Sequence, residues 1–208
     1  MERWDGEAQL NDITAQTLVA STEVPTASFY MIAVPTPIGP DKTPDISFVE
    51  AAARAIAPRI LPGACIIIES TSPVGTTERV AQIIADMRPD ISVPRDGSTE
   101  EADIALAYCP ERVLPGRIVN ELVHNDRVIG GVTPACAERA AVLYTSFVKG
   151  DCLYTSARVA ETVKLVENSF RDVNIAFANE LSMIADVIGV DVWDVIRLAN
   201  RHPRVNIL

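Results

Sequence analysis

The chain has 208 residues, of which 48% are hydrophobic and 22% are charged, enough for a packed core in one domain and part of a second. The formal net charge of −10 and the absence of a basic face argue against a nucleic-acid partner. Its apolar runs are too short to cross a bilayer, and residues 1–12 lack the apolar core of a signal peptide, so we expect a cytoplasmic protein with no membrane partner. The four cysteines are far apart and form no CxxC pair, which favours reduced thiols over disulfides or a zinc site.

Strands and helices are predicted to alternate over the first three-quarters of the chain. The predicted strands are short apolar runs over residues 28–34, 64–70, 102–109, 126–131 and 152–155. Helical patterns cover residues 45–61, 74–88 and 133–148, with Asp45 expected as the first N-cap and Pro134 in the first turn of the last helix. This alternation predicts an α/β fold, a partial Rossmann-like doubly wound parallel sheet covered by helices on both faces.

The pattern becomes purely helical near residue 157. Apolar residues spaced by threes and fours predict one helix from about 157 to 188, with Gly189 as its end and a second helix over residues 190–201. We therefore expect two domains, an incomplete NAD-binding Rossmann-type domain over 1–156 and a truncated central helical domain over 157–208. The wide apolar stripe of the long helix predicts an all-α dimerisation segment and hence a homodimer.

Three loops follow predicted parallel strands and should share one edge of the sheet: residues 34–37, 70–75 and 109–116. The second loop carries hydroxyl groups just before a helix, on Ser70, Thr71 and Ser72. Helix N-termini bind anions and polar ligand edges, although ordinary helix capping explains the same residues.

A carboxylate and an ammonium group stand at positions suited to catalysis. Glu111, in the third loop, could act as a general base, or form a surface pair with the neighbouring arginine. Lys164 and Asn168 are four residues apart and share one face of the long helix. Together they suit an oxyanion, but a solvated face with Lys164 paired to Glu161 or Glu167 is the alternative.

Six segments of the chain resemble the UDP-glucose/GDP-mannose dehydrogenase family from about residue 28 to 208: "FYMIAVPTP", "IIIESTSPVGTTE", "AYCPERVLPG", "NDRVIGG", "KLVENSFRDVNIAFANEL" and "VIRLANRHPRVNIL". The "PERVLPG" and "RHPRVNIL" forms most closely resemble the branch that acts on UDP-N-acetyl-D-mannosamine. The resemblance implies an oxidoreductase of polysaccharide biosynthesis with a UDP-sugar substrate, NAD as cofactor and no metal. It would oxidise C6 of the sugar to a carboxylate in two hydride transfers, through a thioester on a cysteine.

The resemblance also implies roles for individual residues. Lys164 and Asn168 would stabilise the oxyanion, Glu111 would do acid–base work, and Thr71 would lie near the nicotinamide and the catalytic water. The residues expected to bind the cofactor are Val34, Pro35, Thr36, Ser70, Thr71 and Ser72. Those expected to bind the substrate are Glu111, Arg112, Val113, Leu114, Lys164, Asn168 and Arg204.

Two family motifs are not present in the chain. It contains no G-x-G, so the first βαβ unit with the GxGxxG fingerprint is missing, and no Gly-Gly-His-Cys segment with the nucleophilic cysteine. Cys109 resembles a non-nucleophilic family position. We therefore expect an internal fragment that is inactive alone. The alternatives are a UDP-N-acetylglucosamine or UDP-glucose 6-dehydrogenase, a more remote 3-hydroxyacid dehydrogenase, or a non-catalytic remnant that only dimerises.

Overall fold

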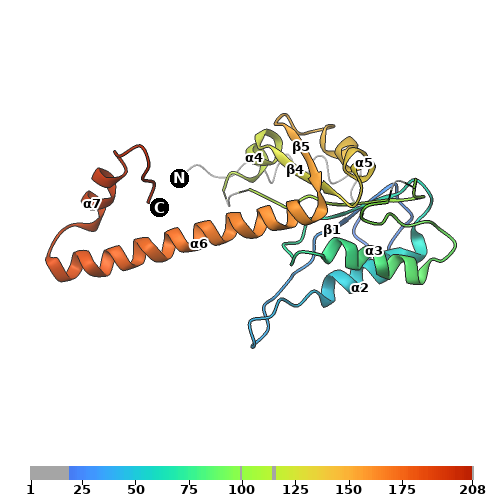
Figure 1. Cartoon of the computed structure of the whole chain (residues 1–208), viewed down its shortest axis with the longest axis horizontal. Coiled ribbons are helices and arrows are strands. Elements are labelled where there is room, and N and C mark those ends of the chain that lie inside the picture. Colours follow the sequence, from blue (N-terminus) through green and yellow to red (C-terminus); the bar gives the residue numbers. More distant parts are fainter. Residues whose placement is uncertain (1–18, 99, 114–115, 208) are drawn as a thin grey trace. The chain divides into compact units, whose positions relative to one another are not determined.

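The computed structural model describes residues 19–98, 100–113 and 116–207 of the chain. The described residues form one five-stranded sheet in the order β1-β2-β3-β4-β5, and the chain divides into two compact units, residues 1–162 and 163–208 (Figure 1). The strands are β1 (Phe29–Ile32), β2 (Cys65–Ile68), β3 (Ala105–Tyr108), β4 (Arg127–Gly131) and β5 (Cys152–Ser156). Every predicted strand is present, so the α/β fold class is confirmed.

The prediction that all neighbouring strands are parallel is wrong at one pair. β1, β2 and β3 are mutually parallel, and β4 is parallel to β5, but β4 runs antiparallel to β3. A parallel connection needs a crossover that covers a face of the sheet. In the described part of the segment between β3 and β4, the helix is the short α4 (Ile118–His124), which has no buried residue, so the chain reverses direction instead.

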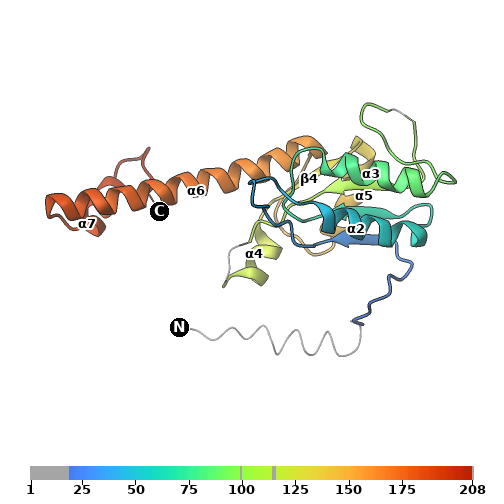
Figure 2. The same ribbon diagram turned by 90° about the horizontal axis from the view of Figure 1, so that it is seen from below.

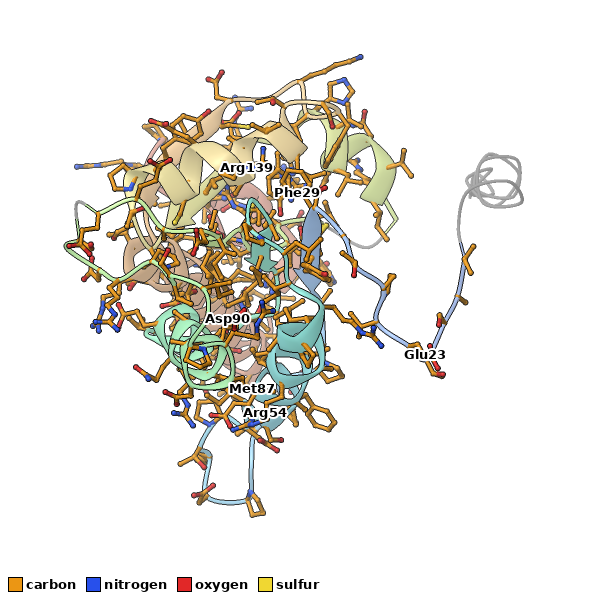
Figure 3. The ribbon with its side chains drawn as sticks, turned by 90° about the vertical axis from the view of Figure 1, so that its right-hand side faces the viewer. Glu23, Phe29, Arg54, Met87, Asp90 and Arg139 are labelled. Atoms are coloured by element: carbon orange, nitrogen blue, oxygen red, sulfur yellow. The ribbon has the colours of Figure 1, made fainter. Side chains whose placement is uncertain are left out.

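Helices cover both faces of the sheet, as a doubly wound fold requires. α2 (Ser47–Ile56), the 3₁₀ turn η1 (Ala57–Arg59) and α3 (Thr76–Met87) lie on one face, and α5 (Pro134–Tyr144) lies on the other (Figures 1 and 2). Arg139 of α5 lies over the ring of Phe29 in β1, 5.2 Å from its centroid (Figure 3). α2 begins at Ser47, two residues after the expected cap, but the Asp45 carboxylate still accepts a hydrogen bond from the Ser47 amide at 2.8 Å.

The core lies between these layers and is built from small and branched side chains. β2 is buried along its whole length, as is β3, which accounts for their unbroken apolar sequences. The helices contribute the buried residues Val49, Ala53, Val80, Ile84, Ala137 and Ala140.

The second unit contains most of α6 (Ala157–Ile188) and all of α7 (Val192–Ala199). Gly189 ends α6 with a φ of 73°, and the amide of Val190 donates to the Ala185 carbonyl oxygen at 3.0 Å, which is a C-terminal helix cap. The predicted extent of the long helix is therefore confirmed. Among the described helices, none is both long enough and apolar enough to span a membrane.

Candidate active site

The edge of the sheet at the carboxyl ends of β1, β2 and β3 carries the three loops singled out in the sequence. Because these strands are parallel, residues 34–37, 70–75 and 109–113 all emerge at that edge. The antiparallel β4 adds something the sequence did not predict. Tyr108 pairs with Gly130, so the start of β4 at Arg127 extends past the end of β3 to the same edge. The edge thus combines three strand ends with a strand beginning.

The first two loops are fastened to each other by hydroxyl groups. The Ser70 hydroxyl accepts from the Val34 amide at 2.8 Å and lies 2.7 Å from the Val34 carbonyl oxygen, to which it can donate. The Thr36 hydroxyl donates to the Thr71 carbonyl oxygen at 2.5 Å, and the Ser72 hydroxyl donates to the Ser70 carbonyl oxygen at 2.9 Å. The structure therefore brings these predicted site residues together.

The hydroxyl groups of the second loop differ in exposure. Ser70 and Ser72 are buried, and their side chains serve the loop pair itself, whereas Thr71 is half-buried. In the first loop Val34 and Thr36 are half-buried and Pro35 is exposed. Contact of these six residues with a cofactor stays a prediction.

The N-terminus of α3 holds an anion, and that anion belongs to the chain. Gly75 is the N-cap residue with a φ of 97°, and no side chain of the loop caps the helix. Instead the carboxylate of Glu161, from the first turns of α6, accepts from the Gly75 amide at 2.6 Å and from the Thr77 amide at 2.9 Å. The Thr77 hydroxyl donates to the same carboxylate at 2.7 Å. Neither ordinary Ser or Thr capping nor an open anion site describes this helix start.

Sequence reasoning missed this role of Glu161, which was considered only as a surface partner of Lys164. The Glu161 side chain is fully buried, on the same part of α6 as the buried residues Ala157 and Ala160. A carboxylate among buried alanines of a helix face was the available signal, because such a group needs donors to balance its lost hydration.

Glu111 lies at the junction of the third loop and β4. Its Oε1 accepts from the amides of Arg112 and Val113 at 2.8 and 3.0 Å and lies 3.8 Å from Nη1 of Arg127. The Arg127 side chain is 2% exposed and the Glu111 side chain 41% exposed, although the Oε2 atom of Glu111 is itself buried. Arg112 instead directs its guanidinium to the Asp126 carbonyl oxygen at 3.1 Å. Leu114, the remaining residue of the predicted substrate loop, lies outside the described residues.

Arg127 also belongs to a buried polar cluster with Tyr144 and Glu69. The Arg127 guanidinium lies over the Tyr144 ring, 5.7 Å from its centroid, and donates to the Leu122 carbonyl oxygen at 3.1 Å. The Tyr144 hydroxyl donates to Glu69 at 2.8 Å, and burial raises the pKa of Glu69 above its usual range. Burial also raises the pKa of Cys109 to about 12, which leaves this thiol protonated near neutral pH and unsuited to act as a nucleophile.

The remaining predicted site residues belong to the second unit. Lys164 and Asn168 are half-buried on α6, and Arg171 donates to the Asn168 side-chain oxygen at 3.3 Å. Arg204 is exposed, and its amide donates to His202 at 3.3 Å. The convergence of Lys164 and Asn168 with Thr71 and Glu111, which belong to the other unit, stays a prediction.

Comparison with known proteins covers almost the whole chain. Residues 6–148 match the NAD binding domain of the UDP-glucose/GDP-mannose dehydrogenase family, and residues 158–208 match its central domain. The UDP-N-acetyl-D-mannosamine dehydrogenases of Yersinia pestis and Escherichia coli K12 are 59% identical over 191 residues, which are 92% of this chain and 45% of each relative. The NDP-N-acetyl-D-galactosaminuronic acid dehydrogenase of Ralstonia nicotianae is equally similar, with the same coverage.

Solved structures give the same assignment. The UDP-D-ManNAc dehydrogenase of Pyrococcus horikoshii superposes with a TM-score of 0.87 at 42% identity, and the UDP-N-acetyl-mannosamine dehydrogenase of Staphylococcus aureus with 0.83 at 44%. Each superposition covers 100% of this chain and 49% of the other. The chain thus spans about half the length of these relatives, and it belongs to the UDP-glucose/GDP-mannose dehydrogenase family.

Proposed function

We propose that the chain forms the cofactor-side loops and central helix of an NAD-dependent dehydrogenase that oxidises C6 of UDP-N-acetyl-D-mannosamine to the uronate. The observation that carries the proposal is the fastened pair of loops, 34–37 and 70–75, at the carboxyl edge of the sheet, where α/β proteins bind their ligands. The 59% identity to dehydrogenases of that name supports the choice of sugar.

The residues of the edge fit one side of the cofactor. NAD, when bound, supplies the hydride acceptor. The α3 N-terminus cannot hold its pyrophosphate, because Glu161 already takes the Gly75 and Thr77 amides. We place the nicotinamide end along Val34, Pro35, Thr36 and Thr71, while the buried hydroxyls of Ser70 and Ser72 fix the shape of these loops.

The proposed chemistry assigns one task to each polar group. Glu111, whose side chain is partly exposed and has a buried cation nearby, moves protons or positions water. Lys164 and Asn168 donate to the oxygen on C6 as it gains negative charge. Arg112, Val113 and Arg204 contact the substrate. Oxidation beyond the aldehyde needs a thiolate, which Cys109 does not provide, and the chain contains no GxGxxG to hold the pyrophosphate. The 208-residue chain alone should therefore neither turn over a UDP-sugar nor bind NAD usefully.

The sugar has a second candidate. The equal identity to an NDP-N-acetyl-D-galactosaminuronic acid dehydrogenase favours an NDP-linked N-acetylgalactosamine as the next substrate to test. UDP-N-acetylglucosamine and UDP-glucose are the substrates to test after it. The free state of all four cysteines, three of them buried, is consistent with a reaction in the cytoplasm, and the uronate would enter a surface polysaccharide.

A chimera tests the proposed function. The 191-residue stretch of the Escherichia coli relative that matches this chain is replaced by the corresponding stretch of this chain, and formation of reduced cofactor is followed with each sugar. We expect turnover with UDP-N-acetyl-D-mannosamine. Lys164→Ala should lower kcat by roughly 10²–10³-fold with NAD binding unchanged, because one oxyanion donor is lost. Lys149→Ala, at an exposed lysine outside the site, is the control. A folded but inactive chimera, or full turnover by Lys164→Ala, would contradict the proposal.

We further propose that α6 mediates a homodimer. Its exposed apolar side chains recur at helical spacing on one face: Val166, Phe170, Val173, Phe177, Ile184 and Ile188. Phe170→Glu should yield monomers by light scattering, whereas Asn179→Glu, which adds the same single negative charge to the opposite face of α6, should not. A natural chain that is monomeric at high concentration would refute the dimer.

A further inference from the structure

The first turns of α6 are attached to the rest of the first unit at three points. Gly130 of β4 comes so close that a Cβ there would lie 2.6 Å from the Ala160 Cβ, so the helix start packs directly on the strand. Arg158 pairs with Glu78 of α3 through two contacts, at 2.5 and 2.7 Å. The third attachment is the buried Glu161 carboxylate at the α3 N-terminus. The start of α6 is therefore fixed in position along its axis and in rotation.

Of these attachments, the Glu161 carboxylate is the specific one. It is fully buried and accepts three hydrogen bonds, from the Gly75 amide, the Thr77 amide and the Thr77 hydroxyl. Hydrogen bonds to an ionised acceptor are the strong ones, and the positive end of the α3 dipole adds to them. The exposed Arg158–Glu78 pair lies in water and contributes much less.

Glu161 connects α6 to Gly75, and both partners are close in sequence to proposed catalytic groups. Gly75 closes the loop that carries Thr71, four residues earlier. Lys164 and Asn168 follow Glu161 by three and seven residues in the same uninterrupted helix. At about 100° and 1.5 Å per residue, they share its face, about 4.5 and 10.5 Å further along the axis. Loss of the Glu161 attachment therefore frees the start of the helix that carries both groups.

We propose that Glu161 is a positioning residue, which fixes the start of α6, the helix that further along carries Lys164 and Asn168, on the N-terminus of α3. This inference rests on the proposed function. The N-terminus of α3 then binds a carboxylate of the protein itself and holds the start of α6, instead of binding a ligand phosphate.

The test compares four variants in the chimera. Glu161→Gln preserves the shape of the side chain, but its NH₂ group would face a backbone N–H of Gly75 or Thr77, and two donors cannot form a hydrogen bond. We expect kcat to fall on the order of 10²-fold while the KM for NAD changes little. Thr77→Val removes one of the three hydrogen bonds and should have a smaller effect in the same direction. Thr77→Ser retains the hydroxyl and should restore most of the rate. Glu78→Gln, which breaks only the surface pair, is the matched control and should leave the rate unchanged.

A further measurement separates failure of the proposed function from failure of the positioning role. Hydrogen exchange of the Gly75 and Thr77 amides in the 208-residue chain should be slow and should accelerate in Glu161→Gln, and this readout requires no enzyme activity. An inactive chimera with slow exchange would reject the proposed function but retain the attachment. An active chimera in which folded Glu161→Gln keeps its natural kcat would overturn the positioning role. If Glu161→Gln does not fold, Thr77→Val decides, and its natural kcat would overturn the role equally.

Discussion

Replacement of Gly130 by alanine should destabilise the first unit, because β4 and the start of α6 leave no room for a methyl group. The new Cβ would lie 2.6 Å from both the Ala160 Cβ and the Ser156 carbonyl oxygen, and 2.8 Å from the Ala157 Cα. Carbon atoms in contact are normally about 3.5–4.0 Å apart, so the helix start must move by roughly 1 Å. Overpacking of this kind costs about 1–3 kcal/mol.

Thermal unfolding of the 208-residue chain, followed by circular dichroism, measures this cost. At roughly 2–4 °C per kcal/mol for a chain of this size, a cost of about 1–3 kcal/mol should lower the Tm of Gly130→Ala by about 2–12 °C. Ala160→Gly removes one of the obstructing atoms, so the double variant should lose less stability than the two single losses combined. The Ser156 carbonyl oxygen remains, so the recovery should be partial. An unchanged Tm for Gly130→Ala, or strictly additive losses, would refute this account of the packing.

Two other predictions concern the buried groups of the first unit. Burial raises the folded-state pKa of Glu69 above its ordinary 4.5. The natural chain should therefore lose stability relative to Glu69→Gln as the pH rises from about 4.5 through the raised pKa. Above that pH, the difference in unfolding free energy between the two chains should be constant. Glutamine can still accept the Tyr144 hydroxyl, so urea unfolding across this pH range isolates the ionisation, and a pH-independent difference would contradict the assignment. The thiols of Cys65 and Cys109, each with its pKa raised to about 12 by burial, should resist iodoacetamide in the folded chain, whereas the half-buried Cys152 should react first. Peptide mass spectrometry gives the order, and early labelling of Cys109 would be evidence against it.

The sequence predicted the elements of the fold well because their signals are local. The apolar runs of β2 and β3 lie inside the predicted strands, and the spacing of apolar residues gave the extent of α6. The reversal between β3 and β4 was not predicted, since strand direction depends on whether the connecting segment covers the sheet. α4 has no buried residue, and only the structure reveals this.

The candidate site was predicted in part, for a related reason. The sequence predicted that the three loops share one edge of the sheet, because each comes directly after a parallel strand. The contacts that organise them join distant positions: Glu161 reaches Gly75 across 86 residues, and Ser70 reaches Val34 across 36. No local pattern encodes such partners. Arg127 was missed because its place at the site depends on the direction of β4, which sequence periodicity does not determine.

The reversal at β4 also bears on how the chain folds. On β4, the two residues that pair with β3 are Gly130 and Gly131, which have no side chains to select a register, whereas β4 pairs with β5 over five residues. We therefore expect β4, α5 and β5 to assemble first, because five residue pairs define the register of β4 with β5 and only two define its register with β3, and to dock on β3 as a preformed unit. In that order of events Arg127 arrives at the edge of the sheet late, and the Glu111 loop acquires its ion pair only once docking is complete.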